Sequence, residues 1–224
     1  MKNPLICKIV TLAVAAVGLS LSATPAMAQG GSDAFNRPHI NTRWVVTAGS
    51  LSISNHQMVG ASLSLGYLKA SSKDTAASAV VILGGTDLEY GAIALGNIAG
   101  GNNAFVKIQA QNGAGTFDHA GFYTGNNGRG NFFTLSSPVP SPATVDVFFC
   151  GTIATMRITS AAGVQTYTND YGATFGHGGG LGTYGSVGLD NYVGCASGCG
   201  DVVEMRRRAR FQPLRCRGAL TCLS

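Results

Sequence analysis

Short apolar runs, separated by clusters of Gly, Asn, Ser and Pro, make up the chain from Arg43 onward. In Phe105–Ala110 the apolar residues alternate with Lys107 and Gln109, and Ile153–Thr159 follows the same pattern. A period of two places one set of side chains in a core and the other in water, as in an antiparallel strand. The pattern therefore predicts an all-β protein, with strands over 44–48, 51–54, 58–68, 79–83, 92–98, 104–110, 117–124, 132–135, 145–150, 153–159, 164–168 and 186–193.

Turn residues between such runs are typical of a β-sandwich or barrel. Gly151, directly after Cys150, predicts a tight hairpin. The glycine-rich segment 170–185, which includes Phe175, is predicted to be a flexible rim loop before the closing strand. Within it Gly180–Gly185 reads G-x-G-x-x-G, but a strand follows where a dinucleotide site needs a helix. His177-Gly-Gly-Gly180 is similar to esterase oxyanion-hole segments, yet no G-x-S-x-G nucleophile motif accompanies it.

The first 28 residues have the pattern of a cleaved signal helix. Lys2 and Lys8 form a positive segment before an apolar run, Ile9–Leu21, which is followed by the small-x-small sequence Ala26-Met-Ala28. The run is shorter than the roughly 20 apolar residues that a membrane span needs. We therefore expect a secreted protein, periplasmic or extracellular, with a signal peptide over 1–28, a sandwich over 29–199 and no transmembrane span.

Charge separates the domain from its C-terminal tail. The formal net charge is +5, yet residues 29–200 hold seven Lys or Arg against eight Asp or Glu. A nearly neutral body argues against nucleic acid as its partner. The excess lies in the predicted signal peptide and in an Arg-rich tail over 200–224. We expect this tail to be poorly ordered, with binding of an acidic surface or polymer as an alternative role.

Five cysteines remain after residue 28, and export would permit disulfides. Cys195–Cys199 and Cys150–Cys195 are both compatible with the spacing, which does not choose between them. A zinc site at Cys195-x-x-x-Cys199 would lack a second ligand pair. The other cysteines are Cys216 and Cys222.

The segment Asp33-Ala-Phe-Asn-Arg37, followed by Trp44 and by Gly49–Ile53, resembles the opening of a bacterial family. Gly188–Asn191 is similar to the closing strand of the same domains, and Phe117–Tyr123 to one of their mid-sheet strands. These are secreted concanavalin A-like, laminin-G-like jelly rolls of the lectin and glucanase type. The resemblance spans roughly residues 33–194 and departs at 38–40, where Pro-His-Ile stands. It implies a convex and a concave antiparallel sheet, with ligands on the concave face or the rim.

The resemblance also implies a structural calcium ion held by Asp33 and Asp190. Calcium takes six to eight oxygen ligands, so further partners would be needed. The alternative is that Asp33 is solvated and that Asp190 bonds to a loop. No other cofactor is expected.

Aromatic rings and planar amides are the groups that sugars bind. The residues that could supply them are Tyr123, Asn126, Asn127, Arg129, Tyr171, His177 and Tyr184. The alternative is that Tyr123 belongs to the core and that the Asn residues serve turns. Trp44, the single Trp, is expected in the core.

Asp87 and Glu89 are predicted to share one strand face, and a glycosidase needs two carboxylates about 5–9 Å apart. The E-x-D-x-E signature of jelly-roll glucanases is absent, so solvated charges at a strand end are the competing interpretation. The sequence favours a non-catalytic module that recognises carbohydrate. A glycan-cleaving hydrolase and a structural matrix or coat component are the alternatives, and the oligomeric state is not predicted.

Overall fold

The computed structural model describes residues 29–71, 75–97, 102–113, 115–125, 130–174 and 178–195. The predicted signal peptide, the Arg-rich tail, Cys199, Cys216 and Cys222 lie outside this part. Within it the chain forms strands and one short 3₁₀ turn, η1 (Lys69–Ser71). The strands are β1 (Gln29–Asp33), β2 (Trp44–Ala48), β3 (Leu51–Ser54), β4 (Gln57–Gly60), β5 (Ser64–Leu68), β6 (Ala76–Ile82), β7 (Tyr90–Asn97), β8 (Asn102–Gln109), β9 (Thr116–Thr124), β10 (Asn131–Pro140), β11 (Ala143–Cys150), β12 (Ile153–Ser160), β13 (Gly163–Asp170), β14 (Gly179–Tyr184) and β15 (Gly188–Cys195).

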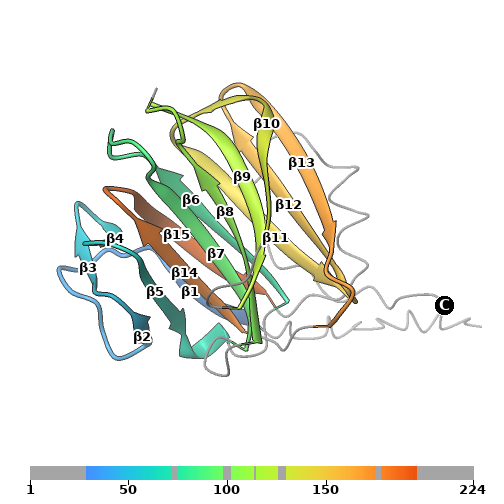
Figure 1. Cartoon of the computed structure of the whole chain (residues 1–224). Helices are drawn as coiled ribbons and strands as arrows, with labels where there is room; N and C mark the ends of the chain where they lie inside the picture. The colour runs from blue at the N-terminus through green and yellow to red at the C-terminus, as the bar shows by residue number, and fades with distance from the viewer. Residues whose placement is uncertain are drawn as a thin grey trace, which may run out of the picture.

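Two antiparallel sheets lie face to face (Figure 1). The first sheet has the order β13-β12-β11-β6-β15-β4-β3, and β1 pairs with β15. The second has the order β10-β9-β8-β7-β14-β5-β2. Neighbours such as β6 and β15, or β7 and β14, are far apart in sequence, so the chain crosses repeatedly between the layers. This arrangement confirms the predicted all-β jelly-roll sandwich.

The core lies between the sheets and follows the alternation seen in the sequence. Val106 and Ile108 of β8 are 1% and 0% exposed, and Met156 of β12 is fully buried. Trp44 is 4% exposed, and its ring contacts those of Phe35 and Tyr192. The prediction that Trp44 is a core residue is therefore confirmed.

Side chains close one edge of the sandwich where β13 lies near β10. The backbone N–H of Ser136 donates to the Tyr167 hydroxyl at 2.9 Å, and the rings of Phe133 and Tyr167 are 4.8 Å apart. In the hairpin between β11 and β12, Gly151 adopts φ +60° and Cys150 pairs with Ile153, as predicted. Cys150 is disulfide-bonded, and so is Cys195 at the end of β15.

Three sequence predictions need correction. The single strand expected over 58–68 is two strands, β4 and β5, in different sheets. The predicted strand 132–135 is longer, because the Ser- and Pro-rich residues 136–140, expected in a turn, belong to β10. Residues 179–184, expected in a flexible rim loop, form β14 inside the second sheet. The reason is that β14 has a ladder on each side, with Gly180 and Gly182 opposite Ala94 and Ala92 of β7.

β15 is the strand that brings the N-terminal segment to the closing motif. Its first half pairs with β4 and its second half with β1, so that Asp33 lies opposite Tyr192. Asn191 adopts φ +50° where the register with β6 shifts. Leu189 is fully buried, as the sandwich requires. No helix among the described residues is long and apolar enough to cross a membrane.

Candidate functional site

The outer face of the second sheet carries a connected group of rings around one lysine. Val106 and Ile108 of β8 point into the core, so the intervening Lys107 points outward, opposite Ala92 of β7 and Gly121 of β9. Aromatic residues of β7, β8, β9, β10 and β14 surround it through ring contacts. We call this group the aromatic face: Tyr90, Phe105, Lys107, Gln109, His119, Tyr123, Phe132 and Tyr184.

Lys107 is the centre of the aromatic face. Its Nζ lies 4.4 Å from the ring centre of Tyr90, 4.9 Å from that of Phe132 and 5.1 Å from that of Tyr123. It donates a hydrogen bond of 2.7 Å to Oε1 of Gln109, and no carboxylate of the described residues forms an ion pair with it. Burial lowers the pKa of Lys107 below its usual 10.5, because removal from water penalises the charged form.

The rings lie in stacked pairs and leave two of them open to solvent. Tyr90 stacks on Tyr184, with centroids 5.3 Å apart and planes 11° apart. Phe105 stacks on Tyr123 at 5.0 Å and 8°. Tyr184 is 41% exposed and Phe132 is 40% exposed. Burial raises the pKa of Tyr90 and of Tyr123, so both hydroxyls stay neutral and keep a proton to donate.

Small residues opposite large ones make room for these flat rings. Gly121 lies opposite Phe132 and two positions before Tyr123 on the same face. A Cβ at Gly121 would lie 2.6 Å from the Tyr123 ring. Because such a contact is prohibitively short, glycine at this position lets the Tyr123 ring lie over the strand.

The structure brings together two of the predicted ligand residues and separates a third. Tyr123 and Tyr184 both belong to the aromatic face. Tyr171 lies elsewhere: its ring stacks on Phe149, and its hydroxyl donates to the carbonyl oxygen of Tyr123 at 3.3 Å. Burial raises the pKa of Tyr171. The remaining predicted ligand residues, Asn126, Asn127, Arg129 and His177, lie outside the described part of the chain.

Sequence reasoning missed Lys107, Tyr90, Phe105 and Phe132. The alternation placed Lys107 on the outer side of its strand, but a lysine is also common on a sheet face that only contacts water. Tyr90, Phe105 and Phe132 lie at or near strand ends in the sequence pattern. These residues alternate with core residues along their strands, and this period of two could have placed their side chains on the outer face of the sheet.

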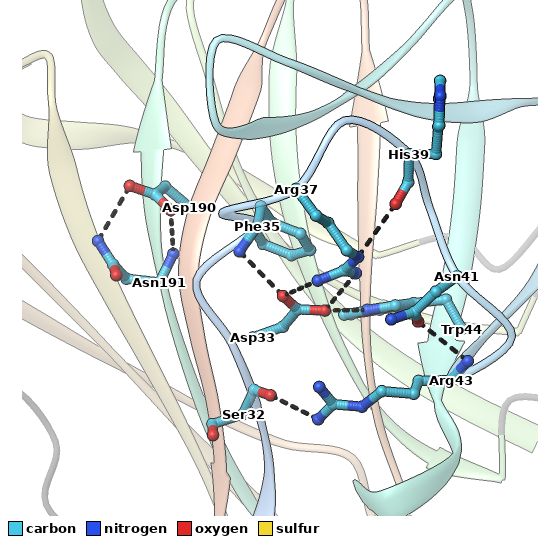
Figure 2. Close-up of polar contacts among 10 residues, drawn as sticks. All are labelled: Ser32, Asp33, Phe35, Arg37, His39, Asn41, Arg43, Trp44, Asp190 and Asn191. Atoms are coloured by element: carbon cyan, nitrogen blue, oxygen red, sulfur yellow. Dashed lines mark hydrogen bonds and ion pairs between the residues drawn. The ribbon is translucent and has the colours of Figure 1, made fainter.

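The candidate calcium residue Asp33 is instead the centre of a buried hydrogen-bond cluster (Figure 2). Its Oδ1 accepts from Nη1 of Arg37 at 2.6 Å and from the backbone N–H of Phe35 at 2.9 Å. Its Oδ2 accepts from Nη2 of Arg37 at 2.6 Å and from Nε1 of Trp44 at 2.7 Å. Burial alone would raise the pKa of Asp33, but these donors outweigh it and hold the pKa below its usual value.

These contacts do not fit a calcium ligand. Both oxygens of Asp33 face cationic or N–H groups, which a cation would have to displace. Asp190 turns to its neighbour Asn191 and accepts hydrogen bonds of 2.7 and 3.0 Å from it. No cluster of three or more His, Cys, Asp or Glu occurs among the described residues. Asp33 is also not solvated, since it is 5% exposed. Beside this cluster is a hollow of about 320 Å³ that Arg43 and Asn191 help to line.

The candidate catalytic pair Asp87 and Glu89 does not share a strand face. Both lie in the turn before β7, where Leu88 adopts φ +60° and breaks the alternation. Asp87 is exposed, whereas Glu89 is 1% exposed. The Glu89 carboxylate accepts from the backbone N–H groups of residues 84, 85 and 86 and from the Thr86 hydroxyl, at 2.8–3.2 Å. Glu89 therefore ties the turn together rather than facing a substrate.

No protein family matches the sequence, and no curated protein is similar to it in sequence. Solved structures are similar in fold. An endo-β-galactosidase from Clostridium perfringens, described as releasing GlcNAcα1-4Gal, matches with a TM-score of 0.52 at 9% identity over 76% of this chain and 63% of its own. A β-glucanase from Bacillus licheniformis matches with a TM-score of 0.50 at 12% identity over 75% of this chain and 97% of its own. The chain has the concanavalin A-like jelly-roll fold.

A third jelly-roll structure, the carbohydrate-binding module CBM66 from Bacillus subtilis, matches at 15% identity. It covers 67% of this chain and 94% of its own length, with a TM-score of 0.49. At identities of 9% and 12%, the likeness to the galactosidase and the glucanase shows the fold alone. What the site can bind depends on its own side chains.

Proposed function

We propose that this chain is a non-catalytic binding module, exported from the cell, that recognises carbohydrate on the aromatic face. The observation that carries the proposal is the set of stacked rings on one sheet face, with Tyr184 and Phe132 each about two-fifths exposed. The C–H groups on one side of a sugar ring pack against aromatic rings. Neighbouring hydroxyls and amides can then fix the orientation of the sugar.

The polar groups next to the rings are suited to sugar hydroxyls. Gln109 accepts from Lys107 and donates from Nε2 to Oε1 of Gln111 at 2.7 Å, so a line of amides runs along the edge of the rings. His119 stacks on Phe132, and its Nε2 lies 3.2 Å from the Thr134 hydroxyl. Gln109, His119 and Thr134 are on strands rather than on loops, which keeps their positions fixed before a ligand arrives.

The absence of catalysis is part of the proposal, and it is supported by three carboxylates that are engaged within the fold. Glu89 and Asp33 are buried and hydrogen-bonded to their own turns. Asp146 is 1% exposed and paired with Arg157. Glycoside hydrolysis needs two carboxyl groups that flank the scissile bond. The glucanase and the endo-β-galactosidase of the same fold are named as enzymes that act on carbohydrate, but a shared fold does not determine function.

A glycan array tests the proposal. The full chain should bind a defined subset of glycans. Tyr184→Ala and Phe132→Ala should each weaken this binding about 3- to 10-fold, because one aromatic contact contributes roughly 0.5–1.5 kcal/mol. Ile153→Ala on β12 is the matched control, since Ile153 is 45% exposed but belongs to the other sheet.

Three results would contradict the proposal. An array on which no glycan binds would favour a structural matrix or coat component instead. Equal losses from Ile153→Ala and Tyr184→Ala would mean that the rings of the second sheet are not the binding surface. Release of reducing sugar by the wild-type chain would favour the glycan-cleaving hydrolase.

A further inference from the structure

We propose that the carbohydrate bound by the aromatic face is acidic, and that its carboxylate or sulfate group pairs with Nζ of Lys107. This inference rests on the proposed function and narrows its ligand class. It starts from the fact that Lys107 is a cation held among rings without a carboxylate partner in the described residues. A neutral sugar can accept hydrogen bonds from this group but cannot compensate its charge.

No ion pair compensates the charge of Lys107 among the described residues. β7 contributes the ring of Tyr90, β9 that of Tyr123 and β10 that of Phe132. Its own strand contributes the Oε1 of Gln109. An ammonium group has three N–H donors, and Gln109 accepts one of them. No other acceptor among the described residues contacts Nζ.

The rings explain how the charge is kept at a half-buried position. The electron-rich faces of Tyr90, Tyr123 and Phe132 attract a cation and so offset part of the lost hydration. They also exclude water from one side of the ammonium group. An ion pair formed there is stronger than one formed in open solvent, because the effective dielectric constant is lower.

A sugar that stacks on the rings would bring an acidic substituent next to Nζ. Tyr184 and Phe132, the exposed rings, lie on β14 and β10, so Lys107 on β8 stands between the two strands in the sheet order. Residues 29–200 carry a net charge of −1, so outside the Arg-rich tail the field of the chain does not attract a polyanion. Within residues 29–200, a preference for an acidic glycan would therefore depend on Lys107, and Lys107→Met tests it because any binding through the tail is the same in wild type and variant.

A competing explanation is that Lys107 stabilises the sheet through its ring contacts alone. The two explanations differ in what Lys107→Met does. Methionine keeps the length and packing of the side chain but removes the charge. If the charge of Lys107 stabilises the sheet, removing it should lower the melting temperature. If the charge serves a ligand, removing it should leave the melting temperature unchanged or raise it.

The experiment measures affinity of the full chain by titration calorimetry for polygalacturonate, dextran sulfate and neutral dextran. The variants are Lys107→Met, Lys107→Arg and, as a matched control, Lys69→Met, since Lys69 is exposed on η1. We expect tighter binding of at least one acidic polymer than of dextran. We expect Lys107→Met to weaken it about tenfold or more, because a charge-assisted bond is lost. Lys107→Arg should keep most of the affinity, and Lys69→Met should change it less than about twofold.

The outcomes separate this inference from the proposed function. If Lys107→Met binds the acidic polymers as tightly as the wild type, the inference is wrong. If dextran binds as tightly as the polyanions and Tyr184→Ala abolishes that binding, the inference is wrong but the carbohydrate function stands. If no acidic polymer binds, the inference is wrong, and the glycan array decides the carbohydrate function separately. Binding to polygalacturonate alone or to dextran sulfate alone identifies the carboxylate or the sulfate as the anion.

Discussion

Asp33→Asn is the substitution that most sharply separates a buried hydrogen-bond centre from a calcium ligand. The amide keeps the size of the side chain but replaces one acceptor oxygen by an NH₂ group. If that group takes the place of Oδ2, it faces Nε1 of Trp44 and Nη2 of Arg37, which now donate to that oxygen. Arg37 also loses its counter-ion. Trp44 is 4% exposed, so its N–H cannot turn to water.

The expected loss follows from these contacts. A buried donor left without an acceptor costs about 1–3 kcal/mol, and bonds to a charged group contribute about 1.5–3 kcal/mol each. Arg37 is 22% exposed in its side chain and can recover part of its bonds from water. We therefore expect the free energy of unfolding to fall by about 3 kcal/mol, or roughly 6–12 °C in melting temperature for a domain of this size.

Thermal and urea unfolding, followed by circular dichroism, measure this loss. Asp190→Asn is the matched control, because Asp190 accepts hydrogen bonds from Asn191 alone among the residues drawn in Figure 2. This substitution should change stability by less than about 0.5 kcal/mol. The pKa of Asp33 is lowered in the folded state, so its contribution is complete above the unfolded pKa. It is lost as the pH falls below about 4 toward the folded value, and the gap between wild type and Asp33→Asn should close there. Equal losses from both variants, or a gap that does not change with pH, would refute the reasoning.

Three further predictions concern the turn, the metal and the lysine. Glu89→Gln should lower stability by about 1–3 kcal/mol, because one acceptor of the buried turn is lost, and should leave glycan binding unchanged; loss of binding with unchanged stability would contradict this. Adding EDTA should shift the melting temperature by less than about 1 °C, because N–H groups already occupy both oxygens of Asp33. A bound ion stabilises the folded state, so a drop of several degrees would show a metal. Lys107→Met should melt at or above the wild-type temperature at neutral pH. Because the folded pKa of Lys107 is lowered, any excess should shrink as the pH rises toward 10.5, and a variant that melts lower would contradict this.

The core could be predicted from the sequence because alternation reports burial directly. Val106, Ile108 and Met156 are buried where the period of two placed them. β14 was missed because its Gly-rich sequence carries the composition of a loop, whereas its strand conformation comes from ladders to β5 and β7. Those partners lie far away in the sequence, so no local pattern reveals them.

The candidate site could be predicted only in part, for a similar reason. Tyr123 and Tyr184 were found as aromatic residues, but their common face depends on the pairing of β7 with β14 and of β8 with β9. The role of Lys107 depends on rings from three strands, which a single strand pattern cannot show. Glu89 looked like half of a catalytic pair because the positive φ of Leu88, which turns it inward, is not visible in the residue types.

The most direct test of the aromatic face as a binding surface is a crystal structure of the full chain with an acidic oligosaccharide that the calorimetry identifies. The account predicts a sugar ring stacked on Tyr184 or Phe132 with its anionic group within hydrogen-bonding distance of Nζ of Lys107. A sugar bound in the hollow beside Arg43 and Asn191, with the aromatic face uncovered, would contradict it.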